Sequence, residues 1–440
     1  MSVLSEDFKT LLEWLNWQES LHVTEIDLGL GRVQRVAAEM TLLQPSATII
    51  TVAGTNGKGS CIATLEALLL KTGASVGAFT SPHLHRYNER IRINGQNVTD
   101  ADLCHSFSRI NRARQTTSLT YFEFGTLAAI DLFTLNNVDV MLLEVGLGGR
   151  LDAVNIMPHD VAVVTSIALD HEAWLGSDVN VIGREKAGIF RAHKPALCAD
   201  TNAPSSVALV AQECGAEFMS VPSDFSWLLD ESKWSWCGRN KDGRFIQFDE
   251  LPLPKLPLPS VAVAIMAFLH ADFDALQNEN KVQFLFDYLP SILSELSLPG
   301  RTQTMTVANR SLIFDVAHNP AAALNLSRYL QRNTIVGETW AIVGMMSDKD
   351  HLAVFDSLSV SVNHWLTTDL AGVGRAASAI ELKNELLANL DPDLSVQHFD
   401  HVSKALNSAL TKSQAEDRII IFGSFYTVAQ AQSVLDAVES

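Results

Sequence analysis

Short apolar runs alternate with longer segments of helical periodicity along most of this 440-residue chain. Before residue 222 the runs of strand length lie at 47–53, 76–79, 138–145 and 161–167. Helical patterns fill the stretches between them, within 5–42 and at 61–72, 99–114 and 124–136. Strands that alternate with helices predict an α/β fold with a mostly parallel, doubly wound sheet. Such sheets bind ligands beyond the carboxyl ends of their strands.

The pattern changes at residue 222 and is restored after residue 300. Residues 222–250 carry three tryptophans and a turn at 241–243, which predicts an antiparallel hairpin. The prolines of 251–259 predict an extended segment, and a helix is expected from about residue 260. We interpret Pro299 and Gly300 as a hinge between domains at 1–298 and 299–440. In the second domain we expect strands at 311–315, 339–343, 364–367 and 419–422 and helices at 320–331, 350–358, 376–388, 401–414 and 426–438.

A glycine-rich loop follows the first strand-like run, with the sequence Gly54-Thr55-Asn56-Gly57-Lys58-Gly59-Ser60. Glycines allow backbone N–H groups to surround phosphate oxygens, and the N-terminus of the following helix adds partial positive charge. Lys58 would neutralise phosphate charge, and Ser60 would reach a magnesium ion. The spacing differs from the usual G-x-x-x-x-G-K-[ST] pattern, so a strand–helix turn with a surface lysine is the alternative.

The charge balance excludes some classes of partner. The chain has 32 Lys and Arg against 50 Asp and Glu, a net charge of −18. This acidity argues against nucleic acid and anionic membranes as partners, because both require clustered basic residues. The five cysteines form no CxxC pair, so we expect neither a disulfide framework nor a zinc site. Without a signal-peptide pattern or an apolar stretch of about 20 residues, a cytoplasmic protein is expected.

Polar residues directly follow several of the apolar runs. Each of them is a candidate ligand, and each also has a purely structural interpretation. Glu144 ends one run and would bind magnesium or face solvent. His171 follows the next run as a metal ligand, a base or an ordinary turn histidine. Ser81 lies in a Ser-Pro turn and is a ligand only if that turn packs near Lys58. Lys186 by itself belongs to a solvated charge run.

The second domain repeats this arrangement. Asp315 and His318 follow its first expected strand, at the edge where open α/β sheets bind ligands. The local alternative is a helix start, with Asn319 as the N-cap and Pro320 as the first helical residue.

Seven motifs together carry a family resemblance. They are GTNGKGS at 54–60, TSPHL at 80–84, LEVGLGGRLD at 143–152, LDH at 169–171, EKAG at 185–188, LPGR at 298–301 and DVAHNP at 315–320. In this combination the chain resembles the bacterial bifunctional dihydrofolate synthase/folylpolyglutamate synthases, which are Mur ligase-like ATP-dependent amide ligases. The resemblance implies an N-terminal P-loop-type ATPase domain with a mostly parallel sheet and a smaller Rossmann-like α/β C-terminal domain.

The resemblance also implies a reaction. ATP phosphorylates a carboxylate, and the amino group of L-glutamate displaces phosphate from the acyl phosphate. The carboxylate belongs to dihydropteroate or is the γ-carboxylate of a reduced folate. The cofactors implied are ATP, two Mg²⁺ ions and a monovalent cation. The implied partners are these small molecules alone, with the protein acting as a monomer.

The family's site residues carry over by position. Nucleotide contacts fall on Thr55, Asn56, Gly57, Lys58, Gly59, Ser60, Ser260, Arg301, Asp315 and His318. Metal contacts fall on Ser60, Ser81, Glu144, His171 and Lys186, of which Lys186 matches a lysine that this family carbamylates. Lys58, His171 and Lys186 are the catalytic candidates. Pterin contacts fall on Asp27, Leu28, Gly29, Thr120, Tyr121, Phe122, Glu123, Leu151, Asp152 and Ala153.

The chain departs from the family pattern at four places. Ser260 stands where an ATP-contacting Asn is usual, and a hydroxyl cannot reproduce the paired donor and acceptor of a carboxamide. Val154 replaces a usual Thr, Tyr426 replaces a usual His, and a usual Pro-Arg-Gly is scrambled near Gly374. None of these touches the proposed metal set, so we expect activity to survive.

Three other functions remain open from the sequence. A Mur-type ligase of UDP-sugar peptide precursors shares the chemistry, although only about 50 residues precede the phosphate loop. A regulatory nucleotide-binding protein would lack ligase chemistry, against which Lys58, Glu144, His171 and Lys186 argue. A monofunctional polyglutamylase is the third, and the segments at 27–29 and 120–123 favour the bifunctional enzyme over it.

Overall fold

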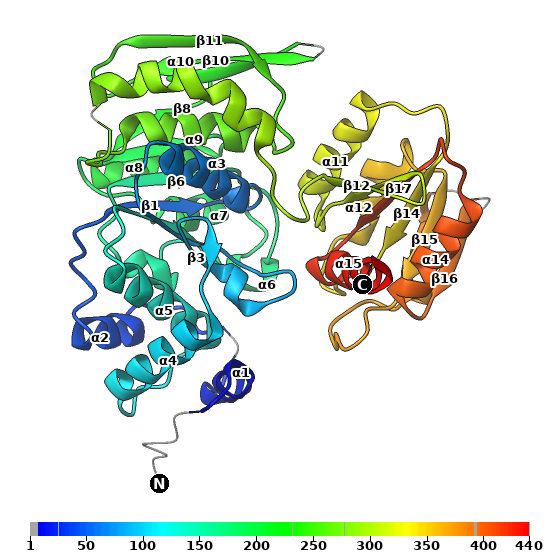
Figure 1. Cartoon of the computed structure of the whole chain (residues 1–440), viewed down its shortest axis with the longest axis horizontal. Coiled ribbons are helices and arrows are strands. Elements are labelled where there is room, and N and C mark those ends of the chain that lie inside the picture. The colour runs from blue at the N-terminus through cyan, green and yellow to red at the C-terminus, as the bar shows by residue number, and fades with distance from the viewer. Residues whose placement is uncertain (1–7, 25, 231, 277, 391–393, 440) are drawn as a thin grey trace. The chain divides into compact units, whose positions relative to one another are not determined.

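The computed structural model describes the chain except residues 1–7, 25, 231, 277, 391–393 and 440. The chain divides into two compact units, Met1–Leu296 and Ser297–Ser440, each with its own sheet (Figure 1). Within the described residues, no helix combines the length and apolar character needed to cross a bilayer.

The first unit is built on one large sheet. Its strands are β1 (Thr48–Ala53), β2 (Val76–Phe79), β3 (Ile91–Ile93), β4 (Gln96–Asn97), β5 (Val140–Glu144), β6 (Val161–Val164), β7 (Pro195–Cys198) and β8 (Glu217–Ser220). They lie in the order β4-β3-β2-β5-β1-β6-β7-β8 and are parallel from β2 to β8, whereas β3 and β4 pair antiparallel. Val52 of β1 pairs with Glu144 of β5, so the phosphate loop and Glu144 leave the sheet at the same edge.

Helices cover this sheet. They are α1 (Leu11–Leu21), α2 (Gly31–Glu39), α3 (Lys58–Lys71), α4 (Asp100–Arg114), α5 (Tyr121–Leu135), α6 (Glu172–Leu175), α7 (Val179–Ala187), α8 (Ser205–Cys214), α9 (Leu258–His270) and α10 (Asn278–Glu295), with the 3-10 helices η1 (Tyr87–Arg90) and η2 (Ala153–Ile156). The helix expected from residue 124 begins at Tyr121, because Thr120 and Glu123 form a reciprocal capping box.

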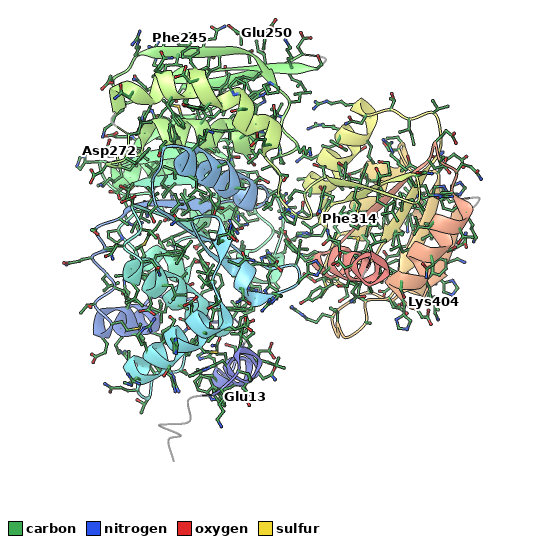
Figure 2. All side chains as sticks on the ribbon, in the orientation of Figure 1. Glu13, Phe245, Glu250, Asp272, Phe314 and Lys404 are labelled. Carbon is green, nitrogen blue, oxygen red and sulfur yellow. The ribbon has the colours of Figure 1, made fainter. Side chains whose placement is uncertain are left out.

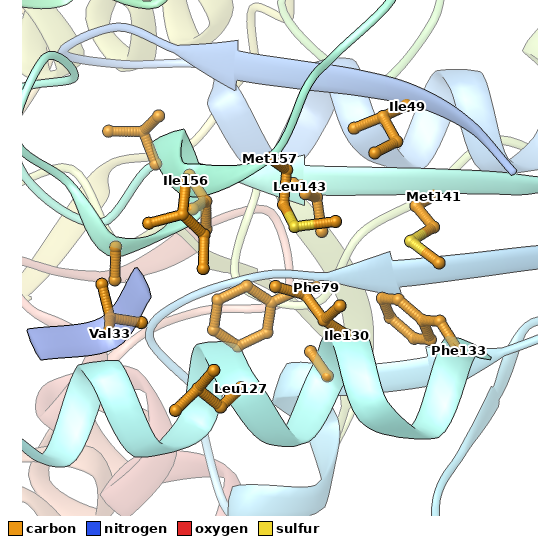
Figure 3. Packing of buried hydrophobic residues seen from close by; sticks show 14 of the residues in the cluster. Val33, Ile49, Phe79, Leu127, Ile130, Phe133, Met141, Leu143, Ile156 and Met157 are labelled. Atoms are coloured by element: carbon orange, nitrogen blue, oxygen red, sulfur yellow. The ribbon is translucent and has the colours of Figure 1, made fainter. Parts of the chain in front are cut away.

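The core of the first unit lies between α5 and the strands. Leu127, Ile130 and Phe133 of α5 face Phe79 and Met141 (Figure 3). Gly77 of β2 allows this close approach, because a Cβ there would lie 2.4 Å from the Phe133 ring. Apolar burial of this kind contributes about 25 cal/mol per Å² and fixes the register of the strands that present the site.

The expected antiparallel hairpin is confirmed and has a third strand. β9 (Phe225–Leu229), β10 (Lys233–Arg239) and β11 (Phe245–Pro252) form a separate sheet in the order β11-β10-β9. Trp234 and Trp236 lie two residues apart on β10, and both are buried. The Trp236 Nε1–H donates to the Ala262 carbonyl of α9 at 3.1 Å. Phe245 and Glu250 of β11 are exposed (Figure 2). The hairpin therefore packs on α9 with one face.

The second unit is a six-stranded α/β domain. Its strands lie in the order β12 (Gln303–Val307), β13 (Arg310–Phe314), β17 (Arg418–Phe422), β14 (Thr339–Val343), β15 (His364–Thr368) and β16 (Ser395–Phe399), and only β12 is antiparallel to its neighbour. Its helices are α11 (Pro320–Arg332), α12 (His351–Ser359), α13 (Ala379–Asn389), α14 (Val402–Lys412) and α15 (Phe425–Glu439). The four strands and five helices expected from the sequence are confirmed. The edge strands β12 and β16 were not predicted, because they are only partly buried and lack an apolar run.

Candidate functional site

The phosphate loop lies between β1 and α3 and is packed too tightly for side chains at two of its glycines. A Cβ on Gly54 would lie 1.9 Å from the Thr165 hydroxyl, and one on Gly57 would lie 2.2 Å from the Ser260 hydroxyl. Gly57 also has φ 88°, a conformation that favours glycine, immediately before α3 begins at Lys58. Ser260, at the start of α9, therefore lies against the loop.

Two hydroxyls beyond β6 hold this loop, and the sequence did not identify them. The Thr165 hydroxyl donates to the Asn56 carbonyl at 2.7 Å, and the Ser166 hydroxyl accepts from the Asn56 N–H at 2.9 Å. The Thr55 N–H donates to the Ser166 carbonyl at 2.7 Å. Because β6 pairs with β1, polar residues directly after β6 lie beside the phosphate loop. The two polar residues after this apolar run were the only sequence feature that could have pointed to this contact.

Two lysines meet at one carbonyl of the loop. The ammonium groups of Lys58 and Lys186 lie 3.1 Å and 3.0 Å from the Gly54 oxygen. Lys186 comes from α7 and is 4% exposed. Its burial, together with the positive charge of Lys58, lowers the pKa of Lys186 to about 7. The expectation of a solvated charge run is wrong for Lys186, although Arg184 is partly exposed and pairs with Glu213.

The loop after β5 places Lys186. A Cβ on Gly149 would lie 2.7 Å from the Glu185 carbonyl oxygen, so glycine is needed for the loop to reach α7. The Arg150 N–H donates to that same carbonyl at 2.9 Å, and the Arg150 guanidinium pairs with the Glu185 carboxylate at 2.8 Å. The LGGR and EKAG motifs are therefore two sides of one contact.

Glu144 and the Ser-Pro turn are brought together at the carboxyl edge of the sheet. The Ser81 N–H donates to Glu144 Oε2 at 3.1 Å, and Glu144 is 4% exposed, so the solvent-facing alternative is wrong. The Ser60 hydroxyl is buried and has no hydrogen-bond partner within the part of the chain that the structure describes. A buried hydroxyl without a partner is costly, which fits an oxygen that completes its contacts with a cation.

The available ligands suit a magnesium ion shared with phosphates. The described residues contain no group of three or more His, Cys, Asp and Glu side chains placed to hold a metal ion. Mg²⁺ typically binds through one or two carboxylates together with phosphate oxygens and water, so Glu144 and hydroxyls suffice. His171 lies immediately before α6, is exposed and adopts a left-handed conformation with φ 53°.

Asp152 organises the loop after β5. Its Oδ2 accepts from the N–H groups of Gly146 and Leu147 at 3.0 Å and 2.9 Å, and its Oδ1 accepts from Val154 N–H at 3.0 Å. Burial raises the pKa of Asp152 to about 6, although these hydrogen bonds act to lower it. Val154, one of the departures from the family pattern, is fully buried beside it.

The three segments expected to contact a pterin lie close together, and an arginine joins two of them. Arg32 donates to Asp27 Oδ2 at 2.6 Å and to Glu123 Oε1 at 3.2 Å, which links the segments 27–29 and 120–123. The third segment, Leu151, Asp152 and Ala153, enters η2, which contacts α2 and α5. Arg32 was not identified from the sequence, because nothing in its local pattern distinguishes it from a surface arginine.

Aromatic rings lie beside this junction. The Phe122 ring packs over Gly146, where a Cβ would lie 2.6 Å from the ring. Tyr121 makes an edge contact with Tyr87 at 5.4 Å between centroids, and the Arg90 guanidinium lies 5.6 Å from the Tyr121 ring.

In the second unit, Arg301, Asp315 and His318 gather beyond β13. The Asp315 carboxylate accepts from the N–H groups of Thr302 and Ala317, both at 2.8 Å. Burial raises the pKa of Asp315, while the nearby Arg301 acts in the opposite direction. The Arg301 guanidinium lies 5.1 Å from the Phe425 ring.

The start of the helix after β13 is also as the local alternative predicted. His318 Nδ1 lies 2.7 Å from the Val316 carbonyl, so this nitrogen is the donor. Asn319 caps α11 by accepting from Ala322 N–H at 3.0 Å, and Pro320 is the first helical residue.

Comparison with known proteins agrees with this geometry. Residues 300–425 match the family model described as Mur ligase, glutamate ligase domain. The dihydrofolate synthase/folylpolyglutamate synthase of Escherichia coli K12 is 43% identical over 430 residues, which covers 98% of this chain and 96% of that protein. The solved structure of E. coli FolC in complex with DHPP and ADP has a TM-score of 0.90 at 41% identity, covering 99% of this chain and 100% of that one.

A further solved structure contains a metal ion. It is a bifunctional folylpolyglutamate synthase/dihydrofolate synthase with Mn, AMPPNP and L-glutamate bound, with a TM-score of 0.87 at 42% identity, covering 98% of this chain and 99% of that one. The Mur-type precursor ligases share only the superfamily with these relatives. The present chain belongs to the dihydrofolate synthase/folylpolyglutamate synthase family.

Proposed function

We propose that this chain joins the amino group of L-glutamate to the carboxylate of dihydropteroate and to the γ-carboxylate of reduced folates. Each reaction consumes ATP, proceeds through an acyl phosphate and releases ADP and phosphate. The observation that carries the proposal is the convergence of Lys58 and Lys186 on the Gly54 carbonyl, at the sheet edge where Glu144 meets the Ser81 turn.

The phosphate loop and its surroundings would hold the nucleotide and the metals. Thr55 to Ser60 surround the phosphates, and Ser260 lies against Gly57. We assign one Mg²⁺ to Ser60 and the phosphates, and a second to Ser81, Glu144 and His171. When bound, these cations would offset the negative charges of phosphate and carboxylate as they approach. In the second unit, Arg301, Asp315 and His318 are assigned to the nucleotide.

Lys186 would act as a carbamate. The ammonium first loses a proton; the neutral amine then attacks the carbon of CO₂, forms an N–C bond as one C=O π bond opens, and releases a second proton, so that a buried cation becomes a carboxylate-like anion. The lowered pKa of Lys186 makes the neutral amine available near neutral pH. The resulting anion would support the second Mg²⁺ beside Lys58. We also propose that the enzyme uses a monovalent cation and acts as a monomer. These two points rest on the family resemblance alone.

The pterin would bind at the junction of Asp27, Arg32 and Glu123, with Tyr121 and Phe122 as flat apolar contacts. Asp152 would act there by holding the loop, since both of its oxygens accept from backbone N–H groups.

The test is ADP release from ATP and Mg²⁺ with L-glutamate and, separately, dihydropteroate, tetrahydrofolate or no acceptor. The proposal predicts release with each acceptor only when glutamate is present. Release with tetrahydrofolate alone would reduce the enzyme to a polyglutamylase. Binding of ATP without acceptor-dependent release would contradict ligase chemistry and favour the regulatory alternative.

A further inference from the structure

Arg92 on β3 links three elements around the Ser-Pro turn. It donates from Nε to Glu66 Oε1 at 3.2 Å and from Nη2 to Glu66 Oε2 at 2.7 Å. Its remaining nitrogen, Nη1, donates to the Thr80 hydroxyl at 3.1 Å and to the Glu89 carbonyl at 3.3 Å. The side chains of Arg92 and Glu66 are only 16% and 9% exposed. A largely buried guanidinium with its donors used in this way holds its neighbours in one geometry.

The elements that Arg92 connects carry the oxygens assigned to the metals. Glu66 lies on α3, six residues after Ser60, which is about 9 Å along a helix that rises about 1.5 Å per residue. Thr80 directly precedes Ser81, whose N–H contacts Glu144. Glu89 closes the rest of the turn, because its carboxylate accepts from the N–H groups of Leu84, His85 and Arg86. Arg92 therefore fixes the Ser81 turn relative to the helix that carries Ser60.

We infer that Arg92 is a positioning residue for the second metal site, acting through Thr80 and Glu66 to hold the Ser81–Glu144 oxygens in place against α3, the helix that carries Ser60. The inference rests on the metal assignment made under the proposed function. Mg²⁺ tolerates little deviation from octahedral geometry at about 2.0–2.1 Å, so a small shift of the turn weakens binding. Partners of this kind, one step from the ligands, alter metal affinity when they are removed.

The experiment measures Mn²⁺ bound to the enzyme–AMPPNP complex by electron paramagnetic resonance, and the bound ion that Glu144→Gln removes is taken as the one at Ser81 and Glu144. Arg92→Met should raise the Mn²⁺ concentration for half-occupancy roughly 10- to 100-fold. Thr80→Val keeps the shape of the turn and removes one acceptor, and it should raise that concentration by about three- to tenfold. The kcat at saturating metal should stay close to that of the wild type in both variants, because neither residue touches the reacting atoms.

Arg109→Met is the matched control. Arg109 also donates from two nitrogens to a buried carboxylate, Asp131, and joins α4 to α5. It should lower the melting temperature without changing Mn²⁺ affinity. If Arg92→Met does not fold, Thr80→Val carries the test.

The Glu144→Gln variant distinguishes failure of the inference about Arg92 from failure of the metal assignment on which it rests. If Glu144→Gln loses Mn²⁺ binding while Arg92→Met and Thr80→Val bind it like the wild type, Arg92 is only a structural residue and the inference is overturned. If Glu144→Gln also binds Mn²⁺ like the wild type, the metal assignment itself is wrong, and the inference fails with it.

Discussion

At the scale of the residue, Lys186 combines a buried amine with a position beside the phosphate loop. Its sequence context, between Glu185 and Ala187, is that of a surface helix, and only the family resemblance pointed to a role. The structure shows why the local pattern was misleading: the glycines of the loop after β5 bring backbone against α7 and cover the lysine. Residue-scale burial of this kind depends on a contact 37 residues away in sequence, Gly149 with Lys186, and cannot be read locally.

Lys186→Ala should lower the rate of ADP release by at least about 100-fold, the size of loss expected for one preorganised electrostatic contact. Lys186→Arg should be equally inactive, because it keeps the positive charge and cannot form the carbamate. The loss in Lys186→Ala is not expected to come from unfolding, since an alanine removes a buried amine rather than creating one. Lys186→Arg buries a permanent charge, so its melting temperature is compared with that of the wild type. Steady-state rates with a circular dichroism spectrum check this, and a full rate in Lys186→Ala would remove its assigned role.

The pKa of Lys186 gives a second prediction with a definite sign. Burial lowers this pKa from 10.5 to about 7, so the folded amine is neutral above about pH 7, where an exposed lysine is still charged. Between about pH 7 and pH 10.5, the unfolded chain binds more protons at Lys186 than the folded chain does. The free energy of unfolding therefore increases as the pH rises through this range and decreases as the pH falls toward 7.

Carbamate formation should follow the same titration. At a fixed concentration of dissolved ¹³CO₂, the rate of carbamate formation on Lys186 should level off above about pH 7 and fall roughly tenfold per pH unit well below it. Carbon-13 NMR of the wild type against Lys186→Arg measures this. A rate that keeps rising to pH 10 would contradict a neutral buried amine.

At the scale of the element, the strands that present the site were predictable because they are mostly apolar and buried. β1, β5 and β6 are central, parallel strands. Because both faces of these strands are buried, their sequences are almost continuous apolar runs. The strands β3, β4, β7 and β8 were missed, and β3 carries Arg92, so the link between α3 and the Ser81 turn was also missed. Thr165 and Ser166 were not identified for a related reason, because their partners in the phosphate loop are set by the pairing of β6 with β1, which single-sequence periodicity does not give. Arg32 was not identified because its partner Glu123 lies 91 residues away, on α5.

The first turn of α5 combines stability and substrate binding. Thr120→Ala removes the side-chain half of its capping box and should cost about 1 kcal/mol. Because Glu123 of this turn accepts from Arg32, the variant should also raise the KM for dihydropteroate several-fold and leave the KM for ATP unchanged.

Thr99→Ala is the control for this prediction. It removes the equivalent capping box of α4, formed by Thr99 and Asp102, and should cost a similar stability with no change in either KM. Thermal unfolding and steady-state kinetics of both variants decide the matter. Equal KM values for dihydropteroate in the two variants would show that the first turn of α5 does not serve the substrate.

At the scale of the whole molecule, the division into two α/β units and the order of their motifs agree with the ligase chemistry of the family. An acyl phosphate is hydrolysed by water, so a site built from tightly packed loops, with buried Glu144 and Lys186, suits such an intermediate. Neither the charge of the chain nor its composition pointed to this reaction. The resemblance of the ordered motifs did, and the structure supplies a physical reason for the glycines of two of them, at 54–60 and 143–152.

The acyl phosphate is the central claim, and isotope transfer tests it most directly. Dihydropteroate labelled with ¹⁸O in both carboxylate oxygens is incubated with the enzyme, ATP, Mg²⁺ and L-glutamate, and the inorganic phosphate is analysed by mass spectrometry. If the carboxylate attacks the γ-phosphate and glutamate then expels phosphate, each phosphate released should carry one ¹⁸O. Unlabelled phosphate accompanying amide formation would contradict the account.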